Sequence, residues 1–314
     1  MSLLFFTLNI VAPIFILIVL GNILKKINLV NDVFISQVSK FVFKVSLPAL
    51  IFLKISTVKI TEAFDGLLIS TSFVLVLVIA GFSWVLSSLL NITPKDKGVF
   101  VQGSFRSNFA IIGLALIANL IGEENLGKAS LVLAFIMPLY NILAVVVLTV
   151  PFKGKKQYNY LQTIVEVGKN PLIIAAFLAT PFSIFQVNLG QIFTITLTYL
   201  AKIALPLALV SIGGSLNFKA LKKASKLSFI ATFNKIVLFP LIAVLLGISM
   251  NFNSEQMVIL FILFASPTAV ASFIMADAMG SNSKLAGDII VLSTLLSIIT
   301  LSTGIILLKN YSII

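Results

Sequence analysis

Long apolar stretches alternate with short polar loops along nearly the whole chain. Ten of the stretches approach the length of about 20 mostly apolar residues that a helix needs to cross a bilayer. Lipid offers no hydrogen-bond partner to an open strand, and the alternating pattern of barrel strands is absent, so each stretch is predicted to be a helix. The predicted spans are Phe5–Leu24, Val33–Ile55, Phe64–Leu90, Val99–Ile121, Leu126–Val150, Thr163–Thr180, Gln191–Leu216, Leu227–Met250, Glu255–Met279 and Leu285–Leu308.

The composition also indicates a lipid environment. The chain is 59% hydrophobic and 10% charged, whereas soluble chains are about 25% charged. It contains no cysteine and no histidine, which excludes disulfides, thiolate nucleophiles, histidine bases and Cys/His metal sites. We therefore predict an all-α polytopic membrane protein that has no cofactor or metal site and is not an enzyme.

The positive charge follows the loops. The net charge is +12, but the lysines lie in short loops between apolar runs and form no single basic face, so we expect a lipid bilayer partner and no nucleic acid. Loops after odd-numbered spans, such as those with Lys25 and Lys153, carry most of the loop lysines, which predicts that these loops are cytoplasmic. An even number of spans then places both termini outside the cytoplasmic membrane.

The two halves of the chain resemble each other. A single offset aligns Pro13 with Pro171, Gly122 with Gly280, and one K-x-x-L-P sequence with another, at Lys44–Pro48 and Lys202–Pro206. Each half has five spans, so the second copy enters the membrane in the opposite direction, and such inverted repeats are typical of secondary transporters. We predict a first five-helix repeat at 1–150, a cytoplasmic basic linker at 151–161 and a second, inverted repeat at 162–314.

Two spans at equivalent repeat positions carry small and polar residues in mid-membrane. The fourth span contains Gln102–Gly113, with Gly113 at its end, and the ninth contains Phe264–Ser272, with Pro267 inside it. Proline removes a backbone donor, glycine loosens a helix, and broken helices are tolerated where they line a cavity. We predict helix breaks that bind an ion or anion; simple kinks are the alternative.

Arg106 is the sole arginine of the chain, and it lies inside an apolar span. A charge at such a position costs about 2.5–3.5 kcal/mol on insertion scales. Its planar fork suits a carboxylate or phosphate, so Arg106 is a candidate anion anchor. The alternative is an arginine that extends to the cytoplasmic surface near Lys97.

Polar side chains gather around the two predicted breaks. We assign Asn108, Asn141, Ser266, Thr268 and Ser272 to substrate binding together with Arg106. Such residues also join helices to one another in lipid, which is the alternative for each residue taken singly.

Three ionisable residues are candidates for ion coupling. Asp277 and Asp288 could carry a proton or bind Na⁺, although Asp277 could simply reach water. Lys235 lies near the middle of the eighth span and is a candidate for an internal ion pair. The possible coupling ion is H⁺ or Na⁺.

Several motifs in order resemble the auxin efflux carrier family, which includes bacterial malonate-type carriers and plant auxin exporters. The resemblance covers essentially the whole chain, and its best match is the F-R-x-N…G pattern of the fourth span. The matching stretches are Val11–Gly21, Leu47–Phe52, Phe105–Gly113, Asn141-Ile142, Asn170–Ile174, Ser266–Val270 and Leu292–Ser297. The chain departs from many relatives at Ala115 and Ala271, where they have proline and asparagine.

The resemblance implies ten helices in which the broken spans four and nine cross, and a scaffold of spans 1, 2, 6 and 7. It also implies homodimers and carboxylate substrates moved by an elevator-type shift. The family's functional positions fall on six residues of this chain: Arg106, Asn108, Gly113, Pro267, Thr268 and Ser272. We therefore predict a secondary transporter of a small organic anion, a mono- or dicarboxylate. The alternative is an anion channel that uses the same helix crossing.

Overall fold

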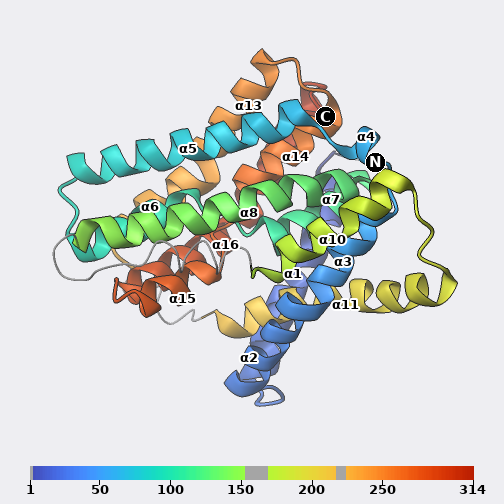
Figure 1. Cartoon of the computed structure of the whole chain (residues 1–314). Coiled ribbons are helices and arrows are strands. Elements are labelled where there is room, and N and C mark those ends of the chain that lie inside the picture. Colours follow the sequence, from blue (N-terminus) through green and yellow to red (C-terminus); the bar gives the residue numbers. More distant parts are fainter. Residues whose placement is uncertain (1–2, 153–168, 217–223) are drawn as a thin grey trace. The chain divides into compact units, whose positions relative to one another are not determined.

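The protein is described from a computed structural model, which covers residues 3–152, 169–216 and 224–314. All the elements labelled in Figure 1 are helices. The chain forms two compact units, each assembled from separate stretches. Among the described residues, unit 1 contains 3–69, 110–137 and 169–216, and unit 2 contains 70–109, 138–152 and 224–314.

Unit 1 is centred on helices α1 (Leu3–Lys26) and α11 (Gln191–Ser215), which lie against each other. A Cβ atom on Gly213 of α11 would overlap the carbonyl oxygen of Ile18 of α1. The two backbones can approach this closely because glycine has no side chain, as is common where helices pack in membranes. The other elements of unit 1 are α2 (Asp32–Phe41), η1 (Val42–Ser46), α3 (Leu47–Ser56), α4 (Ile60–Ala63), most of η2 (Phe109–Gly113), α7 (Leu114–Ile121), η3 (Glu123–Asn125), the first part of α8 (Leu126–Thr149) and α10 (Pro171–Phe185).

Unit 2 is centred on α16 (Ser283–Asn310), which contacts α6, α12, α14 and α15. Gly103 of α6 allows the side chain of Ile289 of α16 to pack against its backbone. The bounds of the unit 2 elements besides α16 are α5 (Gly66–Leu89, all but its first turn), α6 (Pro94–Phe105), the second part of α8, η4 (Val150–Phe152), α12 (Lys226–Phe233), η6 (Asn234–Leu238), α13 (Phe239–Ser249), α14 (Ser254–Ala265) and α15 (Ala271–Ala278).

Two wide, π-helical turns have a common cause in the sequence. η1 and η6 each end two residues before a proline, Pro48 and Pro240. Proline has no N–H, and its ring crowds the carbonyl four residues earlier, so the ordinary helical ladder cannot continue. The residue just before each proline instead donates its N–H to a carbonyl five residues back, which widens the turn.

The described helices are suited to a bilayer. Six helical stretches are long and apolar enough to cross one, and three shorter apolar stretches cover 109–121, 171–185 and 254–265. Large apolar side chains also point outward; Phe177 and Ile192 are 77% and 81% exposed. A face of this kind would be unfavourable in water and is favourable in lipid. The outward-facing side chains therefore agree with the apolar stretches in the sequence.

Apart from the sixth, the predicted helical spans agree with the described helices within a few residues. The sixth predicted span, Thr163–Thr180, differs from the structure: Asn170 caps α10, which begins at Pro171 because proline suits the first helical position, and the helix continues to Phe185. Residues 163–168 and nearly all of the basic linker at 151–161 lie outside the described residues. The fourth and ninth spans are each interrupted, between α6 and α7 and between α14 and α15. The total of ten spans and the inverted repeat remain predictions.

Candidate functional site

The two interruptions lie against each other within unit 2. Helix α6 ends at Phe105, and Arg106 already has an extended backbone with φ −77° and ψ 112°. Helix α14 ends at Ala265, and Ser266 is likewise extended with φ −60° and ψ 142°. Ser107 and Thr268 then pair as an isolated antiparallel β-bridge. Two extended segments therefore meet where two helices have stopped.

Backbone groups that the broken helices leave free are satisfied across this bridge. The N–H of Asn108 donates to the carbonyl of Pro267 at 2.8 Å, and the N–H of Ala269 donates to the carbonyl of Arg106 at 3.2 Å. The hydroxyl of Thr268 donates to the carbonyl of Gly103 at 2.7 Å. Because unpaired backbone groups are costly away from water, these bonds stabilise both interruptions.

Of the two residues predicted to break the helices, Pro267 lies inside an interruption and Gly113 lies beyond one. Pro267 lies inside the ninth-span interruption, where it cannot donate to the α14 carbonyl four residues earlier. Gly113 is the last residue of η2 and has ordinary helical angles, φ −62° and ψ −52°. The extended backbone in the fourth span lies earlier, at 106–108, and it forms although the chain has Ala115 where many relatives have proline.

Arg106 is buried at the interruption, with 5% of its surface exposed. Its guanidinium donates to Oδ1 of Asn141 on α8 at 2.8 Å and to the sulfur of Met275 on α15 at 3.0 Å. Neither partner is charged, and no carboxylate forms an ion pair with Arg106 among the described residues. A guanidinium has five donors, so others remain for an anion.

The other predicted binding residues divide into two groups. The hydroxyls of Ser266 and Thr268 are bonded to backbone carbonyls, those of Ile262 and Gly103. They therefore stabilise the interruptions in this structure. The side chains of Asn108 and Ser272 are buried and form no hydrogen bond to the described residues, so they can receive a ligand.

The three coupling candidates have different surroundings. Asp277 is exposed at the end of α15. Asp288 is 1% exposed; one carboxylate oxygen accepts from Lys284 at 3.0 Å, and the other has no hydrogen-bond partner. Lys235 is also 1% exposed, and its ammonium donates to the carbonyl of Phe264. The structure does not pair it with an acid among the described residues.

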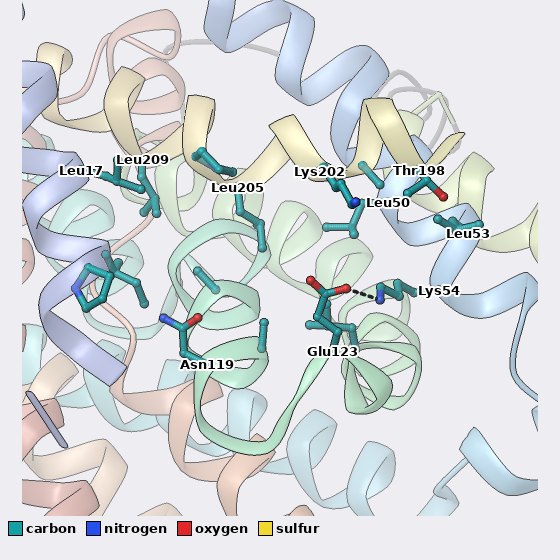
Figure 2. A pocket seen from close by; sticks show the side chains of 17 residues that line it. Leu17, Leu50, Leu53, Lys54, Asn119, Glu123, Thr198, Lys202, Leu205 and Leu209 are labelled. Atoms are coloured by element: carbon teal, nitrogen blue, oxygen red, sulfur yellow. Dashed lines mark hydrogen bonds and ion pairs between the residues drawn. The ribbon is translucent and has the colours of Figure 1, made fainter. Parts of the chain in front are cut away.

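Unit 1 has a separate cavity of about 390 Å³, lined mainly by α1, α3, α7 and α11. Figure 2 shows leucines on its walls together with the side chains of Lys54 and Lys202. Lys54 forms an ion pair with Glu123 at 2.8 Å. Lys202 has no ion pair or hydrogen bond to any described residue. The cavity thus combines an apolar wall with one uncompensated positive charge.

Several residues of the site have no individual signal in the sequence. Met275 holds the guanidinium, and Ser293 of α16 accepts the N–H of Thr268 through its hydroxyl at 3.1 Å. Gln102, one turn before Arg106, has a buried amide oxygen without a partner. A methionine or a serine in an apolar helix is ordinary, so only the three-dimensional arrangement identifies these residues.

The amino-acid sequence of this chain is similar to those of transporters. A family model described as membrane transport protein matches residues 6–305. Similar proteins include an uncharacterized transporter of Methanothermobacter thermautotrophicus, 22% identical over 294 residues, with 93% of this chain and 95% of the relative covered. The uncharacterized transporter YfdV of Escherichia coli K12 is 22% identical over 295 residues, covering 92% and 93%. The uncharacterized transporter MJ1031 of Methanocaldococcus jannaschii is 22% identical over 305 residues, covering 94% and 96%.

These matches confirm the resemblance noted in the motifs. They extend over nearly the full length of this chain and of its relatives, so they concern the whole architecture and not one motif. The chain is a multi-pass integral membrane protein and belongs to the membrane transport protein family, which includes the auxin efflux carriers.

Proposed function

We propose that this protein is a secondary transporter that moves a small organic anion, a mono- or dicarboxylate, across the cytoplasmic membrane. The observation that carries the proposal is the guanidinium of Arg106, buried at the meeting point of two interrupted helices with two neutral partners. A buried charge without a counterion is costly, and a substrate carboxylate would supply the missing negative charge.

The neighbouring groups suit a carboxylate. Asn108 and Ser272 offer an amide and a hydroxyl that form no hydrogen bond to the described residues. Asn141 orients the guanidinium through its side-chain oxygen at 2.8 Å. Helix α15 starts next to this cluster, and its first N–H groups carry partial positive charge. The site would therefore bind the two oxygens of one carboxylate between the guanidinium and uncharged donors.

The cavity of unit 1 also suits an anionic substrate, because the side chains that line it carry a net positive charge. Lys202 contributes an unpaired ammonium to a mostly apolar lining in which Lys54 and Glu123 neutralise each other. A cavity with a net positive charge and low-dielectric walls raises the local concentration of anions. We propose that it attracts anionic substrates and that its apolar wall tolerates a short hydrocarbon chain.

An elevator-type movement is our proposal for the transport step. Spans 1, 2 and 7 lie in unit 1 together with the described part of span 6, and both interruptions begin in unit 2. In an elevator-type movement one body carries the substrate site and the other stays fixed as a scaffold. Unit 2, which carries the Arg106 cluster, would be the moving body, and unit 1 would be the scaffold. We also propose a homodimer, and extracytoplasmic termini from the lysine distribution.

The experiment that tests the function is uptake into proteoliposomes. Purified protein would be reconstituted and supplied with radiolabelled mono- and dicarboxylates, with protein-free liposomes as background. We expect saturable uptake of at least one carboxylate, lost in Arg106→Ala and retained in Lys40→Ala, which removes an exposed lysine of α2.

Two results would contradict this proposal. Uptake by Arg106→Ala equal to wild type would remove Arg106 from substrate binding. Single-channel currents far above carrier turnover would favour the anion channel instead.

A further inference from the structure

Lys235 is a buried lysine that the substrate site does not use. It lies in η6, the wide turn between α12 and α13, and is 1% exposed. No carboxylate forms an ion pair with it in the part of the chain that the structure describes. Among the described residues its ammonium donates to one group, the carbonyl of Phe264. A buried ammonium without a carboxylate is costly, so its position needs a reason.

That carbonyl belongs to the last turn of α14. In an uninterrupted helix it would accept the N–H of Thr268, four residues later. In this structure that N–H donates to the hydroxyl of Ser293 at 3.1 Å. The carbonyl of Phe264 therefore has lost its usual backbone donor and lies at the negative end of a half-helix, where it accepts the ammonium of Lys235. In transporters built from broken helices, such ends are where Na⁺ or H⁺ is held.

The groups around Lys235 favour the ammonium over a metal cation. The adjacent Asn234 is 3% exposed, and its amide nitrogen is buried without a hydrogen-bond partner among the described residues. Among the described residues, no group of three or more acidic side chains could hold a metal ion. An alkali cation beside the Phe264 carbonyl would be repelled by the positive charge of Lys235, so removing that charge is what would open the position to Na⁺ or Li⁺.

We propose that the ammonium of Lys235 is a built-in cation that occupies the end of α14, so that transport requires no alkali cation bound at this position. The inference rests on the proposed transport function, because it concerns how the same interrupted helix is held during the cycle. It assigns Lys235 as a positioning residue: it neutralises the end of α14 and does not touch the substrate.

The test combines a stability measurement with transport, in NaCl, LiCl or choline chloride. When Na⁺ is replaced by choline, the melting temperature of the wild type should not change measurably. Its rate of carboxylate uptake should change by less than about twofold. Lys235→Ala should be less stable, and Na⁺ or Li⁺ at about five times its Kd should raise the melting temperature of this variant by about 1–2 °C. Lys235→Arg should remain independent of Na⁺.

Lys44→Ala is the matched control. Lys44 lies in the other proline-linked wide turn, η1, but is exposed. Its removal should produce no response to Na⁺. The melting measurements need no substrate, so they test this inference even if none of the chosen carboxylates is transported.

Three results would overturn the proposal. The first is a wild-type protein whose stability or uptake depends on Na⁺. The second is a Lys235→Ala variant as stable and active as wild type without Na⁺. The third is a destabilised variant that no alkali cation stabilises, which would make Lys235 a tether between helices only.

Discussion

Replacing Arg106 by lysine tests the geometry of the proposed anion site as well as its charge. The guanidinium uses donors for Asn141 and Met275 and retains others for a carboxylate. Lysine keeps the charge but cannot form the paired hydrogen bonds of a planar fork. A hydrogen bond to a charged group contributes about 1.5–3 kcal/mol, so losing one bond of the pair should weaken substrate binding by roughly 10- to 150-fold. Arg106→Met removes the whole interaction and should weaken binding by at least about 100-fold.

The assay is the concentration dependence of carboxylate uptake, read alongside ligand-induced thermal stabilisation of the purified variants. The order expected is wild type, then Arg106→Lys, then Arg106→Met. Asn141→Ala is a useful comparison because it removes only the acceptor at 2.8 Å that orients the guanidinium. Its effect should be smaller, about fivefold for a bond of about 1 kcal/mol.

The reasoning would be refuted by one pattern in particular. If folded Arg106→Met bound substrate within twofold of wild type, the guanidinium would not be the counterion. If Arg106→Lys matched wild type while Arg106→Met failed, charge alone would matter and the fork would not.

Further predictions concern the helices that hold the site. Thr268→Val keeps a similar shape but removes the hydroxyl that donates to the carbonyl of Gly103 at 2.7 Å. We expect a loss of about 1 kcal/mol in the free energy of unfolding, measured as a lower melting temperature. An unchanged melting temperature would show that this hydrogen bond does not stabilise the protein. Gly213→Ala places a methyl group against the carbonyl of Ile18 and should cost about 1–3 kcal/mol by forcing α1 and α11 apart. Gly81→Ala has no atom within 4 Å of its new methyl group and should be neutral or stabilising by up to about 1 kcal/mol. Equal melting temperatures for the two alanine variants would contradict close helix contact as the cause.

Much of the helical architecture could be predicted because lipid leaves the backbone few choices. Continuous apolar runs in lipid must be helices, and charged or turn-forming residues mark where each helix begins and ends. The interruption near Pro267 could also be predicted, since proline cannot donate to the ladder. The interruption at 106–108 was indicated by polar residues in an apolar span.

The contacts of the site could not be predicted, because they depend on which helices become neighbours. Asn141 lies 35 residues from Arg106 and Met275 lies 169 residues away, and both hold its guanidinium. Lys235 was predicted as a candidate for an ion pair, but the structure gives it the carbonyl of Phe264, 29 residues away. A free carbonyl cannot be read from residue types, since it arises when a helix ends and its usual donor turns elsewhere.

The two compact units do not coincide with the two predicted repeats of the sequence. The described parts of 1–150 contribute to both units, and so do those of 162–314. The first half contributes 3–69 and 110–137 to unit 1 and 70–109 and 138–150 to unit 2, whereas the described part of the second half contributes 169–216 to unit 1 and 224–314 to unit 2. The two halves therefore divide between the units in different ways, and the inverted repeat remains a prediction.

The most direct test of the central claim is a cryo-EM structure of the protein saturated with a carboxylate that it transports. The account predicts ligand oxygens about 3 Å from the guanidinium of Arg106, with Asn108 or Ser272 as a second contact. A ligand bound elsewhere, with the guanidinium still bonded to Asn141 and Met275 alone, would contradict it.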